Sequence, residues 1–89
     1  MSLQAQDHYV RVTTTRGSEM ILIRLADAEN ELGTGLGERV HRSWWVAKGH
    51  ASRLERSNGR MELILSNGTS VPVSRSYRKA AEFLVLPPA

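Results

Sequence analysis

The sequence predicts a mainly β fold in which small antiparallel sheets are accompanied by two short helices. Two Asn-Gly pairs, Asn58-Gly59 and Asn67-Gly68, each lie between segments with the alternating apolar pattern of strands. Asn-Gly supplies the positive φ angles that type I′ turns require, so each pair predicts a hairpin. Residues 8–14 alternate between β-branched and polar side chains, which is typical of a half-buried strand.

The N-terminal half is predicted to begin with a hairpin. Residues 8–14 and the more continuously apolar residues 20–25 flank the turn-forming Arg16-Gly17-Ser18. Residues 26–32 have the apolar spacing of a helix, with Gly33 in the stopping position. The glycine-rich residues 33–37 that follow predict a flexible loop.

The C-terminal half is predicted to form a three-stranded meander. A short strand over residues 38–42 comes before it, and the meander comprises residues 52–57, 60–66 and 69–74. Pro72 has no backbone N–H to donate, so the last strand should be an edge strand or contain a bulge.

A final helix is predicted after the meander. Ser74 is a suitable N-cap, and an apolar stripe follows at helical spacing. Pro87-Pro88 should end the helix. The residues of the stripe are Tyr77, Ala80, Ala81 and Leu84.

The length of 89 residues predicts a single domain over residues 1–89. The chain contains no cysteine, which excludes disulfides and thiolate metal sites and fits a reducing compartment. No apolar run approaches the roughly 18 residues needed to cross a bilayer. We therefore expect a cytoplasmic domain that makes no membrane contact.

The net charge of +3 is unevenly distributed. Residues 1–37 contain three basic and five acidic residues, whereas residues 38–79 contain nine basic and three acidic ones. A basic half on one small domain is the electrostatic footprint of a protein that meets phosphate, although basic residues also solvate ordinary surfaces.

Motifs that carry enzymatic chemistry are not found in the sequence. There is no cysteine nucleophile and no Gly-x-Ser-x-Gly or Walker-type loop, and residues 33–37 follow a helix instead of a strand. His8, His41 and His50 lack the spacing of zinc ligands. We therefore expect that the protein is not an enzyme and uses no cofactor or metal.

The segment Val40-His41-Arg42-Ser43-Trp44-Trp45-Val46 resembles the signature of LytTR domains. In that family His-Arg-Ser or His-Asn-Ser is followed by aromatic or apolar residues and Val. Residues 8–12 resemble the family's early strand, residues 19–32 its second strand and short helix, and residues 67–77 its closing hairpin and helix start. The resemblance therefore runs nearly from end to end.

LytTR domains are DNA-binding output domains of bacterial transcription regulators, including response regulators. The resemblance implies elongated β-sheets whose loops enter successive major grooves and bend the duplex. It implies base contacts from His8, Arg42 and Arg75, because arginine reads guanine bidentately and histidine can reach base edges. The phosphate contacts that it implies come from Arg11, Arg39, Ser43, Lys48 and Arg78.

The resemblance also implies partners and context. Family members bind paired direct repeats, so two copies of the chain, as a homodimer on DNA, are expected on one site. We further expect this domain to be a fragment of a longer regulator that has a separate N-terminal regulatory domain.

The chain departs from the family pattern in three places. Ala47-Lys48 stands where members often have Asn after the signature Val. The helix over residues 26–32 lacks a Ser or Thr cap, leaving Asp27 to act from its first turn. Only residues 3–6 remain for the family's first strand, so we expect a truncated edge strand there.

Each implied contact has a structural alternative. His8 is a polar residue at a strand end, and Arg75 is a surface residue at a helix start. His41 is either a hydrogen-bonded structural histidine or a phosphate contact. The arginines around Asn58-Gly59 form a solvated hairpin tip or make auxiliary phosphate contacts.

Trp44 and Trp45 are adjacent, so in a strand their side chains point to opposite faces. One is expected in the core, and the other covers the sheet, lies in an interface or stacks on bases. Two other functions remain open at this point. One is a β-rich protein-interaction module that pairs through an edge strand, and the other is a single-stranded nucleic-acid binder with an exposed tryptophan.

Overall fold

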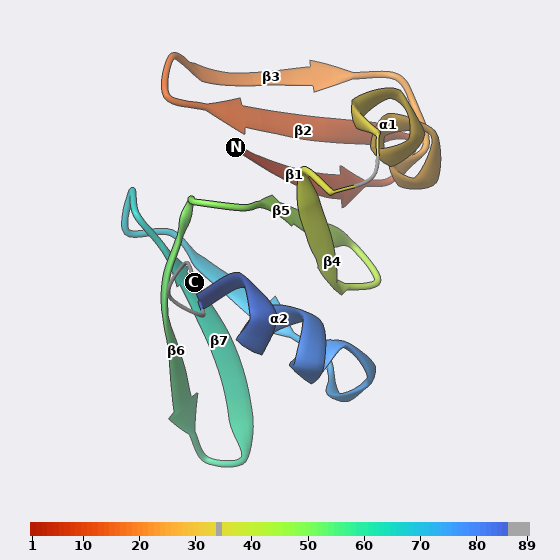
Figure 1. The fold of residues 1–89 in the computed structure, drawn as a ribbon. Coiled ribbons are helices and arrows are strands. Elements are labelled where there is room, and N and C mark those ends of the chain that lie inside the picture. Colours follow the sequence, from red (N-terminus) through yellow and green to blue (C-terminus); the bar gives the residue numbers. More distant parts are fainter. Residues whose placement is uncertain (34, 86–89) are drawn as a thin grey trace.

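The computed structural model describes residues 1–33 and 35–85, which form two antiparallel sheets, two short helices and one 3₁₀ turn (Figure 1). The mainly β prediction is confirmed. In chain order the elements are β1 (Ser2–Gln6), β2 (Tyr9–Thr14), β3 (Gly17–Ile21), α1 (Leu25–Leu32), β4 (Gly37–His41), β5 (Trp44–Ala47), β6 (Ala51–Ser57), β7 (Arg60–Leu65), β8 (Ser70–Val73), η1 (Arg75–Tyr77) and α2 (Arg78–Val85).

The first sheet contains five strands in the order β3-β2-β1-β5-β4. The short first strand was expected at an edge, and that expectation is wrong. Leu3 of β1 lies opposite Val12 of β2 on one side and Trp45 of β5 on the other, and its side chain is only 2% exposed. β1 therefore lies at the centre of the sheet, and Leu3 belongs to the buried cluster beneath it.

The second sheet is the predicted meander, in the order β6-β7-β8. In the first hairpin Asn58 and Gly59 have φ angles of 52° and 77°, as a type I′ turn requires. The second hairpin differs, since only Gly68 has a positive φ and Asn67 does not. Leu65 accepts a hydrogen bond from the Gly68 amide and donates one to the Thr69 carbonyl, so the loop is longer by one residue than predicted.

β8 forms one edge of the second sheet, and Pro72 lies opposite Glu62 of the neighbouring β7. This confirms the edge position predicted for the proline-containing strand. A proline is tolerated there because its missing N–H interrupts no ladder on the outer side.

The β2–β3 hairpin is confirmed, but its second strand is displaced from the predicted residues 20–25. β3 ends at Ile21, and Leu25 already belongs to α1, where it is buried with Ala28. The apolar run is therefore divided between an exposed edge strand and the buried face of a helix. Gly33 ends the helix with a φ of 84°, as predicted.

Gly37 was expected in a flexible loop, and instead it begins β4. A Cβ atom at this position would overlap the Val46 carbonyl oxygen and lie 2.8 Å from the Ala47 Cα atom. The glycine is thus a packing requirement, because β5 and the Trp45 ring pass directly over its backbone.

The final helix begins differently from the prediction. Ser74 makes no side-chain cap hydrogen bond, and the 3₁₀ turn η1 precedes α2. Ala81 and Leu84 are buried as the stripe predicted, whereas Tyr77 and Ala80 are half-buried. The predicted helix stop at Pro87-Pro88 lies outside the described residues.

β5 separates two hydrophobic clusters. Trp45 is 4% exposed and packs with Leu3, Val10 and the buried face of α1, whereas Trp44 packs against the cluster between the second sheet and α2. The two indoles therefore point to opposite faces, as expected, and each contacts a core. Among the described residues, no helix is both long enough and apolar enough to cross a membrane.

Candidate functional site

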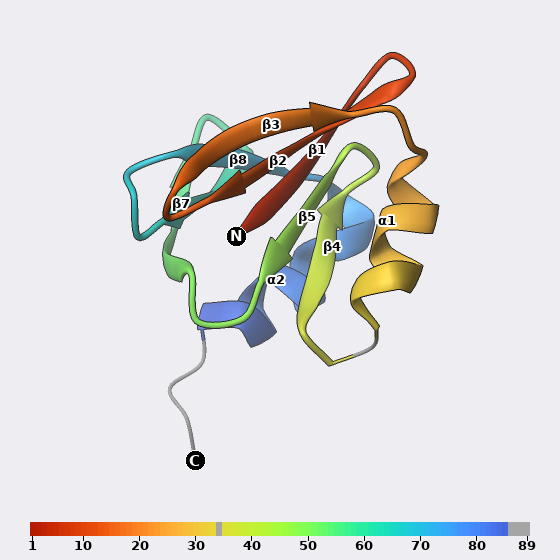
Figure 2. The same ribbon diagram turned by 90° about the horizontal axis from the view of Figure 1, so that it is seen from above.

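Three loops lie along one edge of the molecule, at the right of Figure 1, and Figure 2 shows the same arrangement from above. They are the β1–β2 turn with His8, the β4–β5 turn with Arg42, and the β8–η1 junction with Arg75. The loops that carry the three residues predicted to contact bases thus come from distant parts of the sequence and lie at one edge.

A main-chain hydrogen bond joins the first two loops. The Ala5 amide near the end of β1 donates to the Ser43 carbonyl oxygen in the β4–β5 turn at 2.7 Å. Gln4 also lies opposite Trp44 in the sheet. Because β1 and β5 are paired up to their loops, the loops share a fixed separation.

A second hydrogen bond joins the third loop. The Ser74 amide donates to the Val40 carbonyl oxygen at 3.0 Å. Val40 is fully buried at an irregularity of the β4–β5 pairing, between Arg39 and His41. The loop that bears Arg75 is therefore anchored to the strand that leads into the Arg42 turn.

His41 closes the turn that presents Arg42. Its Nδ1 atom accepts a hydrogen bond from the Ser43 amide at 3.1 Å. This is the structural interpretation of His41 left open by the sequence. A satisfied turn of this kind leaves Arg42 projecting from its tip, and the Arg42 side chain is exposed.

All three predicted base-contacting residues are exposed. Within residues 1–33 and 35–85, none of them forms an ion pair or a side-chain hydrogen bond. Their donors are therefore available to a ligand, as groups that read base edges must be.

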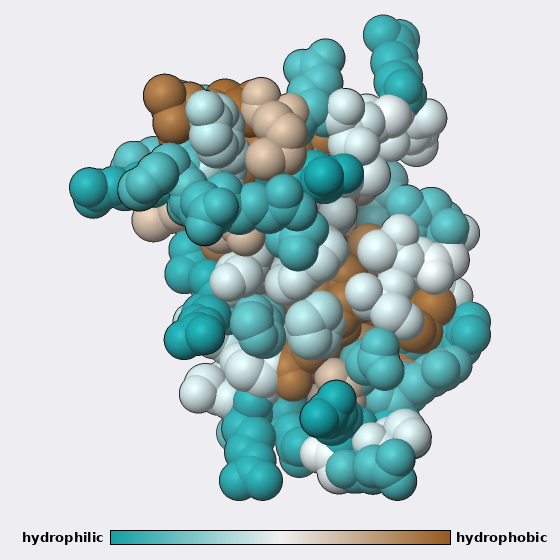
Figure 3. Space-filling model, turned by 180° about the vertical axis from the view of Figure 1, so that it is seen from behind, coloured by the Kyte–Doolittle hydropathy of each residue, from teal (hydrophilic) through white to brown (hydrophobic). Residues whose placement is uncertain are grey.

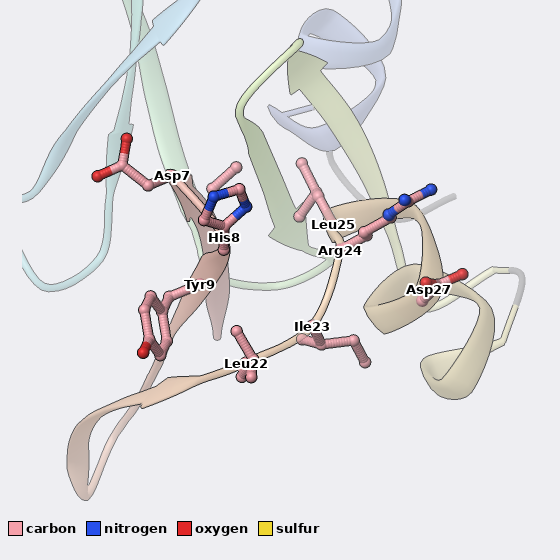
Figure 4. Close-up of a pocket in the computed structure, with 9 residues that line it drawn as sticks. Asp7, His8, Tyr9, Leu22, Ile23, Arg24, Leu25 and Asp27 are labelled. Atoms are coloured by element: carbon pink, nitrogen blue, oxygen red, sulfur yellow. The ribbon is translucent and has the colours of Figure 1, made fainter.

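His8 borders an open hollow of about 590 Å³ (Figure 4). It follows Asp7, which has a φ of 54°, and faces the segment that connects β3 to α1 across the hollow. Leu22 in that segment is 71% exposed, and the Arg24 side chain extends away from His8. The sequence did not predict that residues 22–24 line the hollow opposite His8, because no motif relates them to the His8 turn.

The predicted phosphate-contacting residues are more dispersed. Ser43 lies in the Arg42 turn, and Arg11 is exposed on β2 opposite Gln4 and Met20. Lys48 lies beyond the other end of β5, where its Nζ atom is 5.0 Å from the centre of the Phe83 ring. Of these residues, only Ser43 belongs to the three-loop edge.

Arg39 is engaged within the protein. Its Nε and Nη2 atoms bind the two carboxylate oxygens of Glu29 on α1 at 2.9 and 2.7 Å. The hydrogen bond with Glu29 raises the pKa of Arg39 above its usual range. A phosphate contact from Arg39 stays a prediction, and this geometry favours a role in holding α1 to β4.

Arg78 lines an open groove of about 410 Å³ between η1 and the tip of the β6–β7 hairpin. Arg60 and Arg75 line the same groove, together with His41. The sequence placed Arg75 at the start of a helix, but it did not indicate that the hairpin tip lies beside that helix start.

Known proteins support a nucleic-acid role for this architecture. Residues 1–84 match the family model described as the LytTr DNA-binding domain. Over 76 residues the chain is 37% identical to the CO-responsive transcriptional regulator RcoM of Rhodospirillum rubrum. The match covers 83% of this chain and 32% of that relative, so the chain spans about a third of the relative's length.

A solved structure shares the fold. It is the LytTr DNA-binding domain of a putative methyl-accepting/DNA response regulator from Bacillus cereus, with a TM-score of 0.79 and 28% sequence identity. The superposition covers 96% of this chain and 79% of the other. The chain belongs to the LytTr DNA-binding domain family and is a DNA-binding domain of transcription regulation.

Proposed function

We propose that the domain reads a specific duplex sequence by placing its three adjacent loops in successive major grooves. His8, Arg42 and Arg75 are the base-reading residues in this proposal. The observation that carries it is their arrangement: three exposed residues stand on loops that share one edge and are joined by main-chain hydrogen bonds, and none of their side chains has a partner among residues 1–33 and 35–85. Donors held at fixed separations can match base edges held at fixed separations.

Phosphate contacts position such a reader without selecting sequence. We assign this role to Arg11, Ser43, Lys48 and Arg78, and Arg39 remains a candidate only if its ion pair with Glu29 opens. The basic balance of residues 38–79, which contain nine basic and three acidic residues, supports electrostatic attraction to the duplex.

The wider context is part of the proposal. Two copies bind paired direct repeats, as a homodimer on the DNA, and a separate N-terminal regulatory domain belongs to the complete regulator. The domain acts in the cytoplasm, is not an enzyme and makes no membrane contact. The match to one third of a CO-responsive transcriptional regulator supports the presence of further domains in proteins of this kind.

A binding measurement tests the duplex preference. A fluorescently labelled mixed-sequence duplex and each of its separated strands are titrated with the domain at several salt concentrations. We expect tighter binding to the duplex and affinity that falls steeply as salt rises. Equal or tighter binding to the single strands would contradict the proposal and favour the single-stranded alternative.

A protein-interaction module remains the second candidate function because of the β3 edge. Every residue of β3 is exposed, and Met20 and Ile21 are each 45% exposed beside Leu22. Figure 3 shows apolar side chains gathered where β3 leads into α1. Charge reversal at Arg42 and Arg75 together would leave the activity of such a module intact, whereas it would abolish DNA binding.

A further inference from the structure

The β6–β7 hairpin contains three arginines, and they differ in their partners. Arg53 binds Glu55 at 3.0 Å, and an oxygen of Glu82 lies 3.9 Å from Arg56. Within the described part of the chain, Arg60 has no carboxylate partner. Two of the positive charges are therefore balanced locally, and the one at the tip is not.

The groove beside the hairpin tip concentrates positive charge. Arg60 enters it from β7, Arg75 from η1 and Arg78 from the start of α2, whereas Glu62 is the one carboxylate among its lining residues. Among residues 1–33 and 35–85, the Arg78 Nε atom is buried and has no hydrogen-bond partner. Three guanidinium groups around one open groove favour an oxygen-rich anion, because charge-assisted hydrogen bonds to arginine are among the strongest in proteins.

The position of the groove identifies the anion. Arg75 is both a lining residue of the groove and one of the three proposed base readers, so a duplex in contact with Arg75 would bring its phosphates close to the groove. Asn58 and Gly59 hold the tip in a tight turn, which fixes where Arg60 leaves the hairpin.

We infer that Arg60 is a DNA-backbone contact, so that the β6–β7 hairpin tip and the start of α2 hold the duplex from two sides of one groove. The inference rests on the proposed function and extends it, since it gives the hairpin tip a role that the sequence left open. Arg60 positions the duplex and reads no base.

The test compares Arg60→Gln and Arg60→Lys with the matched control Arg53→Gln on the same hairpin. Affinities for a sequence-selected duplex and a mixed-sequence duplex are measured between 50 and 200 mM salt. Loss of one phosphate contact reduces the steepness of log affinity against log salt by about 0.9. Across this fourfold salt range the affinity of Arg60→Gln should therefore fall by a factor about 3.5 times smaller than that of the wild-type domain. Arg60→Lys and Arg53→Gln should keep the wild-type slope.

The two duplexes separate a backbone contact from a base contact. For Arg60→Gln we expect equal weakening on both duplexes and unchanged base preference. Suppose that binding by the wild-type domain is steeply salt-dependent and that Arg60→Gln shows the same salt slope. That result would overturn the role of Arg60 and leave the proposed function intact. Binding without salt dependence by the wild-type domain would instead overturn the proposed function itself. Urea unfolding midpoints check that the exposed substitutions leave the fold unchanged.

Discussion

The Ser74 amide donates to the Val40 carbonyl oxygen at 3.0 Å, and this hydrogen bond joins the Arg75 loop to the strand that carries Arg42. The bond between the Ala5 amide and the Ser43 carbonyl joins the remaining loop in the same way. The spacing of the proposed base readers is therefore set by main-chain geometry. Within the described part of the chain, none of their side chains takes part in a hydrogen bond or ion pair that holds the loops together.

Replacing Ser74 tests this link. Ser74 has a φ of −80°, which proline adopts readily, so Ser74→Pro removes the N–H donor without requiring a different backbone. We expect a loss of about 1 kcal/mol in the free energy of unfolding and weaker binding to a sequence-selected duplex. Ser74→Ala is the control: it keeps the N–H, and the serine side chain makes no cap bond, so both quantities should stay at wild-type values. Equal effects of the two substitutions would contradict a role for the main-chain bond.

Arg42→Ala should cost ~1–3 kcal/mol in binding free energy on the preferred duplex and relax the preference at one base position. The reason is that a bidentate contact with guanine would be lost from the tip of the β4–β5 turn. Binding of the variant to duplexes that differ at single positions measures both effects. Arg16→Ala is the control. Arg16 is an exposed arginine in the β2–β3 turn, at the end of β2 away from the His8 turn, so its replacement should leave the base preference unchanged. Uniform weakening on all duplexes would instead make Arg42 a phosphate contact.

Gly37→Ala should destabilise the domain by about 1–3 kcal/mol, because the added methyl group meets the β5 backbone and the Trp45 ring. Urea unfolding provides the measurement. Gly59→Asn is the comparison, since a Cβ at Gly59 has no neighbour within 4 Å and asparagine tolerates a positive φ. A smaller loss for Gly37→Ala than for Gly59→Asn would show that the backbone at Gly37 has room for a side chain.

Arg39→Ala should lower the free energy of unfolding by about 1 kcal/mol, because the ion pair with Glu29 is bidentate but still partly exposed. The salt dependence of duplex binding should not change. Glu29→Gln should reproduce the stability loss, since it removes the other half of the same pair. If Arg39→Ala instead reduced the steepness of log affinity against log salt by about 0.9, Arg39 would be a phosphate contact.

Local patterns predicted the parts of the fold that depend on neighbouring residues. Asn58-Gly59 identified the β6–β7 hairpin because the required backbone angles belong to those two residues. Pro72 placed β8 at an edge because a missing donor excludes a central strand. The second Asn-Gly pair predicted its hairpin but not its loop length, which depends on where Leu65 and Thr69 pair.

Nonlocal packing explains what the sequence could not predict. β1 looked like a truncated edge strand because nothing within residues 3–6 shows that β5 will pair with it. Gly37 looked like a loop glycine because the Trp45 ring that covers it comes from another strand. The partner of Arg39 is ten residues away on a helix, and the groove that joins Arg60 to Arg78 forms only when η1 packs beside the hairpin.

The candidate site was predicted through a family resemblance more than through chemistry visible in the residues. The resemblance named His8, Arg42 and Arg75, and the structure adds that their loops share one edge and are joined by hydrogen bonds. Exposed arginines alone would not have distinguished Arg42 from Arg53 or Arg56. Arg53 is paired with Glu55 on the same strand, and Glu82 of α2 lies 3.9 Å from Arg56.

The most direct test of sequence-specific reading is the selection of bound duplexes from a randomised pool, carried out with wild-type domain and with the combined His8→Ala, Arg42→Ala and Arg75→Ala variant. The wild-type domain should enrich short motifs that recur at about one helical turn, and its affinity for them should fall steeply as salt rises. The variant should retain salt-sensitive binding but enrich no motif. Enrichment of the same motif by the variant, or of no motif by the wild-type domain, would contradict base reading by these three residues.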